Sequence, residues 1–142
     1  MATINPYLNF AGNTEEAFNF YRSVFGGEFK NLTRFRDTPE AARVPEKEKD
    51  KLMHVALPVG KTNVLMATDA LESFGQKLVP GNNFYLSIEA DSKSEAEKLF
   101  RGLSEGGTVT QPLQDTFWGY FGMIKDKFGI SWMVNHMHAQ QN

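Results

Sequence analysis

The sequence predicts an α+β fold made of two βαβββ modules, whose curled mixed sheets surround a cavity. Two observations predict this fold. Two stretches with apolar residues at helical spacing each end at a glycine pair, and each has one strand-like run before it and three after it. The two halves also align in residues: Tyr7 matches Tyr85 at an offset of 78, and Gly26 matches Gly106 at an offset of 80. We infer an internal duplication.

The length, charge and cysteine content of the chain exclude several classes of function. A chain of 142 residues fits one domain built from two repeats. With 15 Lys and Arg against 17 Asp and Glu, it has no basic surface typical of partners of nucleic acid or of an anionic membrane. It contains no cysteine, which excludes disulfides, thiol nucleophiles and thiolate metal sites. No signal peptide or membrane-spanning run is visible, so we expect a cytoplasmic protein.

The first module is predicted over residues 4–68. Asn13 is the expected N-cap of its helix, with Glu16 at the capping-box position, and Gly26-Gly27 ends that helix. A charged excursion, residues 37–51, is predicted to hold one helical turn at Pro39–Arg43. The expected strands are Ile4–Ala11, Glu28–Phe35, Leu52–Val59 and Asn63–Thr68.

The second module is predicted over residues 83–136, after a linker at 69–82 and before a tail at 137–142. Asp91 or Ser92 is expected to cap a helix at about Lys93–Ser104. The stretch Asp115–His136 contains two aromatic-rich runs separated by Lys125–Gly129, which predicts a hairpin. The remaining expected strands are Asn83–Ala90 and Thr108–Leu113.

Three segments carry a family resemblance: NPYLNFAGNTEEAFNFYRSVFGGEF, MHVALPVGKTNVLMATDA and FWGYFGMIKDKFGISWMVN, the last with the pattern WG…D-x-F-G-x-x-W. Together they resemble the vicinal oxygen chelate superfamily of glyoxalases, extradiol dioxygenases and bleomycin-resistance proteins, and in particular its PhnB-like branch. The resemblance covers nearly the whole chain. It implies the glyoxalase/bleomycin-resistance-like fold but no single chemistry.

The resemblance also implies where a metal ion would bind. Metalloenzymes of this superfamily hold a divalent ion with His and Glu from the first and last strands of each module. Those positions fall on Pro6, Met66, Asn83 and Met133, and such side chains do not suit a catalytic divalent ion. We therefore predict no metal site and no cofactor.

Period-two alternation, in the inward register that the family implies, predicts a lining that is mostly apolar with a few hydroxyls and amides. Such a lining suits a small, partly hydrophobic ligand, and Met at two equivalent positions suits a tolerant pocket. Trp118 would close one end, while Trp132 would point to the helix side. The alternative is that the same side chains fill the space. The lining comprises Leu8, Phe10, Val64, Met66, Thr68, Tyr85, Ser87, Ser131, Met133 and Asn135.

His54 and Asp69 are the catalytic candidates. A two-residue turn at Gly60-Lys61 would send His54 to the far face, and a three-residue turn would place Ala56 opposite Met66 and bring His54 inward. We therefore include His54 among the expected ligand-binding residues.

The other polar candidates have structural alternatives. Asp69 and Asp115 suit a cavity rim, but Asp is also a common turn and capping residue. Asp126 is expected to serve its turn. His136 and His138 would share one face, yet two imidazoles without a carboxylate make an incomplete metal site.

Two functions follow, and a third possibility is assembly alone. The first is metal-independent binding of a small molecule. The second is an enzyme of lyase, isomerase or dioxygenase type, with His54 acting beside Asp69 or the tail histidines. Homodimers are typical of the resembled superfamily, and the modules could pair within one chain or across a dimer.

Overall fold

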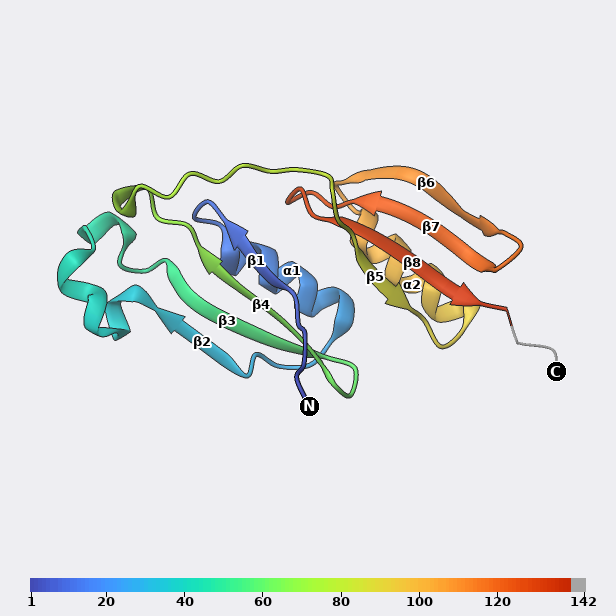
Figure 1. Ribbon diagram of the computed structural model, residues 1–142, viewed down its shortest axis with the longest axis horizontal. Coiled ribbons are helices and arrows are strands. Elements are labelled where there is room, and N and C mark those ends of the chain that lie inside the picture. The colour runs from blue at the N-terminus through green and yellow to red at the C-terminus, as the bar shows by residue number, and fades with distance from the viewer. Residues whose placement is uncertain (139–142) are drawn as a thin grey trace. The chain divides into compact units, whose positions relative to one another are not determined.

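The computed structural model describes residues 1–138, and the chain divides into two compact units, Met1–Val79 and Pro80–Asn142. Each unit has its own four-stranded mixed sheet and its own long helix (Figure 1). The predicted α+β class with two βαβββ modules is confirmed. None of the helices among residues 1–138 combines the length and apolar character needed to cross a bilayer.

The first unit has the strand order β1-β4-β3-β2. Its β1 and β4 are parallel, and the other two pairs are antiparallel. A crossover helix is what allows β1 to become the parallel neighbour of a later strand. The elements are β1 (Tyr7–Phe10), α1 (Thr14–Phe25), β2 (Asn31–Arg34), β3 (Leu52–Val59) and β4 (Asn63–Asp69).

The second unit repeats this plan with the order β5-β8-β7-β6 and a parallel pair of β5 with β8. Ser92 caps its helix: the Ser92 hydroxyl accepts from the Glu95 amide at 3.0 Å, and a Glu95 carboxylate oxygen accepts from the Asp91 amide at 2.9 Å. Glu95 stands at the capping-box position, although its carboxylate bonds the amide of Asp91, one residue before the cap. The elements are β5 (Leu86–Glu89), α2 (Lys93–Ser104), β6 (Thr108–Asp115), β7 (Gly119–Lys125) and β8 (Ser131–Met137).

The core of the first unit lies between α1 and one face of the sheet. Phe18 and Tyr21 on α1 are fully buried, and Phe18 meets the ring of Phe10 edge to face at 6.4 Å. The strands contribute buried side chains at alternate positions, as expected for a sheet covered on one face. The buried strand residues include Leu8, Phe10, Val55, Leu57, Leu65 and Ala67.

The start of α1 differs from the prediction. Asn13 makes no side-chain cap; instead a buried Asp69 carboxylate oxygen accepts from the Thr14 amide at 3.0 Å and from the Thr14 hydroxyl at 2.6 Å. The other Asp69 oxygen accepts from the Leu52 amide at 2.8 Å. Asp69 therefore satisfies helix and strand donors at once.

The core of the second unit is built around Trp132, Ile124 and Val134, which are buried on the α2 side of the sheet. Buried Asp126 accepts from the Trp132 indole N–H at 2.8 Å and from the amides of Phe128 and Ile130 at 2.8 and 3.0 Å. The predicted roles of Trp132 as core and Asp126 as turn residue are confirmed.

The excursion before β3 is ordered into three short 3-10 helices, η1 (Phe35–Asp37), η2 (Pro39–Arg43) and η3 (Glu46–Glu48). The helical turn predicted at Pro39–Arg43 is thus confirmed. Phe35, Val44 and Leu71 bury one another in a small separate cluster, with Met53 packed against it. Leu71 belongs to the segment after β4, which also contains η4 (Glu72–Phe74).

Several helix and strand boundaries in the structure differ from those predicted from the sequence. Asp69 belongs to β4 rather than to the expected linker, and β5 begins at Leu86 rather than at Asn83. The strand after α1 is shorter than predicted, and β6 continues to Asp115. Of the predicted tail, residues 139–142 lie outside the described part of the chain.

Candidate functional site

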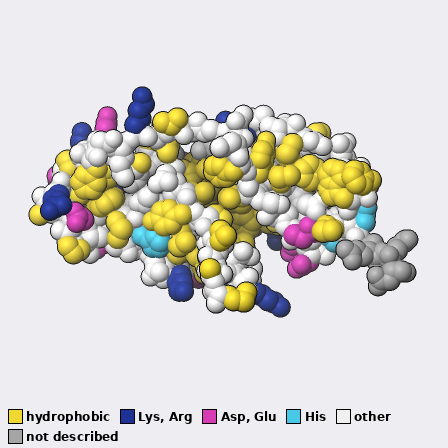
Figure 2. Space-filling model, viewed as in Figure 1, with side chains coloured by type: hydrophobic (Ala, Val, Ile, Leu, Met, Phe, Trp, Pro, Cys, Tyr) yellow, Lys and Arg dark blue, Asp and Glu magenta, His cyan; other side chains and the backbone are white. Residues whose placement is uncertain are grey.

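Each sheet has a helix-covered face and an open face, and the candidate site lies on the open faces. In β4 the helix-side residues Leu65, Ala67 and Asp69 are buried, whereas Met66 and Thr68 between them are only partly buried. The side-chain period of two puts Met66 and Thr68 on the open face, as predicted. Figure 2 shows hydrophobic side chains gathered over the strands of each unit.

His54 also lies on the open face of the first unit. Val59 pairs with Asn63, so three residues form the β3–β4 turn, and Ala56 stands opposite Met66. Of the two turns considered from the sequence, the three-residue alternative is therefore the observed one. Two positions before Ala56, His54 shares its face.

Tyr7, His54 and Thr68 form a polar cluster there. The Tyr7 phenol oxygen is 3.2 Å from Nδ1 of His54, and the two ring centroids are 5.8 Å apart. Burial raises the pKa of the Tyr7 phenol above its ordinary value, and a hydrogen bond with Thr68 opposes this shift. Tyr7 therefore stays protonated at neutral pH and can donate to His54 or to a ligand.

Asp69 does not join this cluster. It is 3% exposed, lies on the helix side and has both oxygens occupied by Thr14 and Leu52. Alternation along β4 sends its carboxylate away from the face that carries His54. The prediction that Asp69 acts beside His54 is therefore wrong, and its role is to cap α1.

The prediction is also wrong for two residues of the expected lining. Leu8 and Phe10 are 4% and 3% exposed and pack on the α1 side, so they belong to the core. Because the phase of β1 is one residue away from that expected, Tyr7 takes the open-face position. Tyr85 precedes β5 and is 39% exposed, so no strand register assigns it to a face.

The second unit places Met133 as predicted. Met133 pairs with Ser87 on β5 and with Met123 on β7, and all three occupy the open face. The pairs Ala56–Met66 and Met123–Met133 make Met66 and Met133 equivalent between units. Thioether side chains adapt to ligands of different shape.

The same equivalence places Phe121 in the second unit where His54 stands in the first. Each lies two positions before the residue opposite the methionine. The first open face therefore carries an imidazole and a phenol at its centre, and the second carries a phenyl ring. The repeat preserves the backbone position but not the chemistry.

Two aromatic side chains of the β6–β7 turn, Trp118 and Phe117, continue the row that begins at Phe121. The ring of Trp118 lies 5.3 Å from that of Phe121, and Phe117 meets Trp118 edge to face at 4.8 Å. Phe117 is 94% exposed and Trp118 is 40% exposed. Exposed aromatic rings in contact suit a ligand surface, as the sequence suggested for Trp118.

Asn135 pairs with Phe121 on this face, at the end of the aromatic row. Its side-chain amide donates to a Glu89 carboxylate oxygen at 2.8 Å, and the other Glu89 oxygen accepts from the Met137 amide at 2.9 Å. The buried Asn135 Oδ1 has no hydrogen-bond partner among residues 1–138. An unmet buried acceptor costs about 1–3 kcal/mol, which makes it a notable feature of the site.

The remaining polar candidates have structural partners. His136 Nδ1 lies 2.9 Å from the Ala90 carbonyl and His138 Nε2 lies 2.9 Å from the Thr116 carbonyl, so both rings act as donors. Asp115 pairs with Lys93 on α2 at 2.9 Å. These contacts tie the end of β8 and the edge strand β6 to their own unit.

The four positions that the resemblance implied for a metal ion carry side chains that do not suit one. Met66 and Met133 lie at the centres of the open faces, opposite Tyr7 and Ser87. Pro6 and Asn83 lie outside the strands β1 and β5. Thioethers, a phenol and a hydroxyl are poor ligands for a catalytic divalent ion. Over residues 1–138, no three His, Asp or Glu side chains are grouped to hold a metal.

A separate cleft of about 780 Å³ opens on the first unit, between η3 and the segment that follows β4. Its lining includes Lys47, Lys51, Lys77 and Glu48. Glu48 is held by Ser73, and Lys51 donates to the Gly12 carbonyl at 2.9 Å. No open-face residue of the Tyr7 cluster contributes to this cleft.

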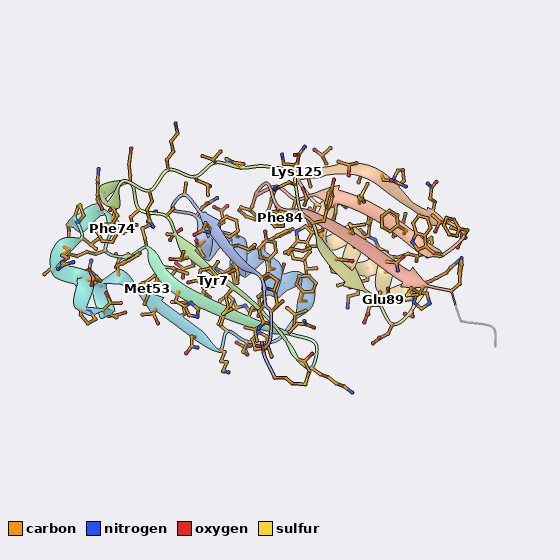
Figure 3. All side chains as sticks on the ribbon, in the orientation of Figure 1. Tyr7, Met53, Phe74, Phe84, Glu89 and Lys125 are labelled. Atoms are coloured by element: carbon orange, nitrogen blue, oxygen red, sulfur yellow. The ribbon has the colours of Figure 1, made fainter. Side chains whose placement is uncertain are left out.

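Sequence reasoning missed Tyr7, Glu89, Phe121 and Met123. Tyr7 and Phe121 were visible as aromatic residues in strands, but their faces depended on registers that only pairing fixes. Glu89 had no signal, because an acidic residue in a strand is typical of any solvated face. Figure 3 labels Tyr7 in the first unit and Glu89 in the second.

Comparison with known proteins identifies relatives along nearly the whole chain. Residues 2–135 match the family model described as 3-demethylubiquinone-9 3-methyltransferase. The crystal structure of PA1353 from Pseudomonas aeruginosa is 41% identical, with a TM-score of 0.86 over 98% of this chain and 100% of that one. Protein YjdN of Escherichia coli (strain K12) is 28% identical over 96% of this chain and 97% of its own length.

Two more distant structures share the fold. A putative 3-demethylubiquinone-9 3-methyltransferase, PhnB protein, from Bacillus cereus is 24% identical, with a TM-score of 0.75 over 95% of this chain and 99% of that one. A glyoxalase/bleomycin resistance protein/dioxygenase family enzyme from Burkholderia phytofirmans is 20% identical, with a TM-score of 0.57 over 93% of this chain and 97% of that one.

Proposed function

We propose a function for this chain from one premise: it belongs to the family described as 3-demethylubiquinone-9 3-methyltransferase, the PhnB-like branch of the glyoxalase/bleomycin resistance/dioxygenase superfamily. The proposed function is metal-independent binding of a small, partly apolar molecule on the open sheet faces. Because function resides in a site rather than in a fold, the methyl transfer named in the family description is not carried over to these residues.

One observation carries the proposal. Met66 and Met133 stand at equivalent central positions of the two open faces. The strand partners of each methionine lie on the same open face, away from the helix. An adaptable thioether supports contact with an apolar ligand, and it is a poor substitute for the carboxylate that a divalent ion requires. Nearby hydroxyl, amide and imidazole groups would orient the ligand.

The test uses purified full-length protein dialysed against EDTA and the neutral, apolar fluorophore N-phenyl-1-naphthylamine. We expect saturable binding that needs no added metal. Met66→Glu places a charge at the centre of the face and is expected to weaken binding about tenfold or more, because a desolvated charge opposes an apolar ligand. Ile4→Glu, at a position that is 95% exposed, is the matched control and should bind as the native chain does.

Native mass spectrometry of the same protein provides the contradicting outcome. A stoichiometric divalent ion that EDTA removes, together with an activity lost on removal, would sink the metal-independent proposal. Equal fluorophore binding by Met66→Glu and Ile4→Glu would show that the open face of the first unit is not the site.

A second candidate is an enzyme of lyase, isomerase or dioxygenase type that uses His54. The contact between Tyr7 and His54 favours it, since a phenol within 3.2 Å of an imidazole is a possible acid–base pair. Tyr7, rather than Asp69, is then the acid–base partner of His54. If this candidate holds, His54→Ala abolishes turnover of the screened substrate while the fold is retained; an unaffected rate would contradict it.

Two further expectations belong to the proposal: a homodimer and a cytoplasmic location. Light scattering coupled to size-exclusion chromatography measures the subunit count, and cell fractionation measures the location. A stable monomer that retains full fluorophore binding would remove the homodimer from the proposal.

A further inference from the structure

We propose that the open face of the second unit binds the cationic end of a small ligand, an ammonium or guanidinium group with N–H donors. This inference rests on the proposed function and names the class of its ligand. The groups that would recognise the cation are the Asn135 amide oxygen, the Glu89 carboxylate and the ring of Trp118, which packs on Phe121. All of them lie within the second unit.

The Asn135 oxygen supplies the first reason. The amide nitrogen of Asn135 faces a Glu89 oxygen at 2.8 Å, and a carboxylate can only accept, so the orientation of the amide is fixed. Oδ1 is therefore directed away from Glu89, and it is buried with no donor among residues 1–138. A buried acceptor is satisfied when a ligand brings an N–H or O–H to it.

Glu89 supplies the second reason. It stands beside Asn135 in the parallel β5–β8 pair and has one oxygen held by the Asn135 amide and the other by the Met137 amide at 2.9 Å. Two donors hold the carboxylate in place, and each of its oxygens retains a free lone pair. A preorganised carboxylate next to an unmet amide oxygen favours a ligand that is both positively charged and a hydrogen-bond donor.

The aromatic row supplies the third reason. Phe121 is the direct partner of Asn135 across β7 and β8, and Trp118 lies 5.3 Å from Phe121. The faces of aromatic rings attract cations, and indole attracts them most. Trp118 is 40% exposed, so its ring is accessible to a ligand, whereas Phe121 is 7% exposed and supports Trp118 from beneath.

The basic residue of β7 does not compete for these groups. Lys125 occupies the last position of β7, where it pairs with Ser131 rather than with Asn135 (Figure 3). On the helix side, Lys93 is paired with Asp115 at 2.9 Å. Glu89 lies beside Asn135 on the open face and forms no ion pair among the described residues. Its carboxylate could therefore pair with a cationic group of the ligand.

The test compares three probes with the same ring. Benzylammonium carries charge and N–H donors, benzyltrimethylammonium carries charge without donors, and benzyl alcohol carries a donor without charge. We expect benzylammonium to bind most tightly and to shift the amide signals of residues 89, 121 and 135 in ¹H–¹⁵N spectra of the full chain. Both analogues are expected to bind more weakly, by about fivefold or more, because each lacks one of the two interactions.

Variants separate the proposed contacts from general effects. Glu89→Gln should weaken benzylammonium binding by about fivefold, since hydrogen bonds to charged groups are stronger than those between neutral groups. Glu105→Gln, which removes an exposed carboxylate just after α2, is the matched control and should leave binding unchanged. Phe121→Leu tests the ring without altering charge, and the amide spectrum of each variant checks its fold.

The outcomes distinguish this inference from the proposed function. Equal binding of benzylammonium and benzyl alcohol, or equal effects of Glu89→Gln and Glu105→Gln, overturns the cation inference. Neutral-fluorophore binding that is sensitive to Met66→Glu would then still support the proposed function. A benzylammonium site whose signal shifts map only outside the second open face also overturns the inference.

Discussion

The phenol oxygen of Tyr7 lies 3.2 Å from Nδ1 of His54, although these residues belong to strands that are not neighbours in the sheet. β4 lies between β1 and β3, and both side chains reach across its open-face side. The contact therefore links three strands on the face that has no helix. It also gives that face a preformed polar centre.

We expect Tyr7 and His54 to be energetically coupled. In a double-mutant cycle of Tyr7→Phe and His54→Gln, the coupling energy should be about 0.5–1 kcal/mol, because the hydrogen bond lies at a partly solvated surface. Urea unfolding of the four proteins measures it. Strictly additive effects would mean that the two side chains do not stabilise each other.

Asp69→Asn is expected to destabilise the first unit by about 2–4 kcal/mol, because the amide retains one acceptor oxygen while the site presents donors to both carboxylate oxygens. Those donors are the Thr14 amide and hydroxyl and the Leu52 amide. Asp91→Asn, at an exposed position before α2, is the matched control and should change stability by less than about 0.5 kcal/mol. Thermal unfolding followed by circular dichroism compares them. Equal melting curves would contradict the capping role.

Gly119→Ala is expected to destabilise the second unit by about 1–3 kcal/mol through overpacking. A Cβ at Gly119 would lie 2.5 Å from the His136 carbonyl oxygen and 2.9 Å from Cα of Met137, and both are backbone atoms that cannot turn away. Gly81→Ala, where the nearest atom would be 3.9 Å away, is the control. Unfolding midpoints in urea measure the difference. A neutral Gly119→Ala would contradict the close packing of the Gly119 backbone against β8.

The stability that Glu15 contributes is expected to depend on pH. Arg34 donates two hydrogen bonds to the Glu15 carboxylate, at 3.0 and 2.8 Å, and these lower its pKa, with burial opposing the shift. A folded pKa below the unfolded one means that this stabilisation is present above the unfolded pKa of about 4.3 and is lost as the pH falls through the folded pKa.

Glu15→Gln should therefore be less stable than the native chain by under about 1 kcal/mol at pH 7, since the pair is partly exposed, and the gap should close at acid pH. Glu16→Gln, an exposed neighbour, is the control. Unfolding by urea at several pH values below 7 measures both gaps. A Glu15→Gln gap that widens towards acid pH would contradict the assigned sign.

Much of the fold could be predicted from the sequence because its signals are local. The two Gly pairs, the Ser92 cap and the Asp126 turn each act through neighbouring residues. The 3-10 turn at Pro39–Arg43 likewise follows from a proline at its first position. These features give the order of elements, and the order gives the duplication.

The site could be predicted only in part because faces depend on pairing between distant strands. The length of one turn decides which side His54 occupies, and a shift of one residue in β1 exchanges Phe10 for Tyr7. Asp69 satisfies Thr14 from 55 residues away, so no local pattern reveals that it replaces Asn13 as the cap. The unmet oxygen of Asn135 has no sequence signal at all.

His54 and Phe121 occupy equivalent positions in two units that repeat the same backbone plan. Duplication therefore gave the chain two copies of one scaffold whose open faces now differ in chemistry. The chemistry of one open face therefore does not predict that of the other, and each face has to be assayed as a separate surface.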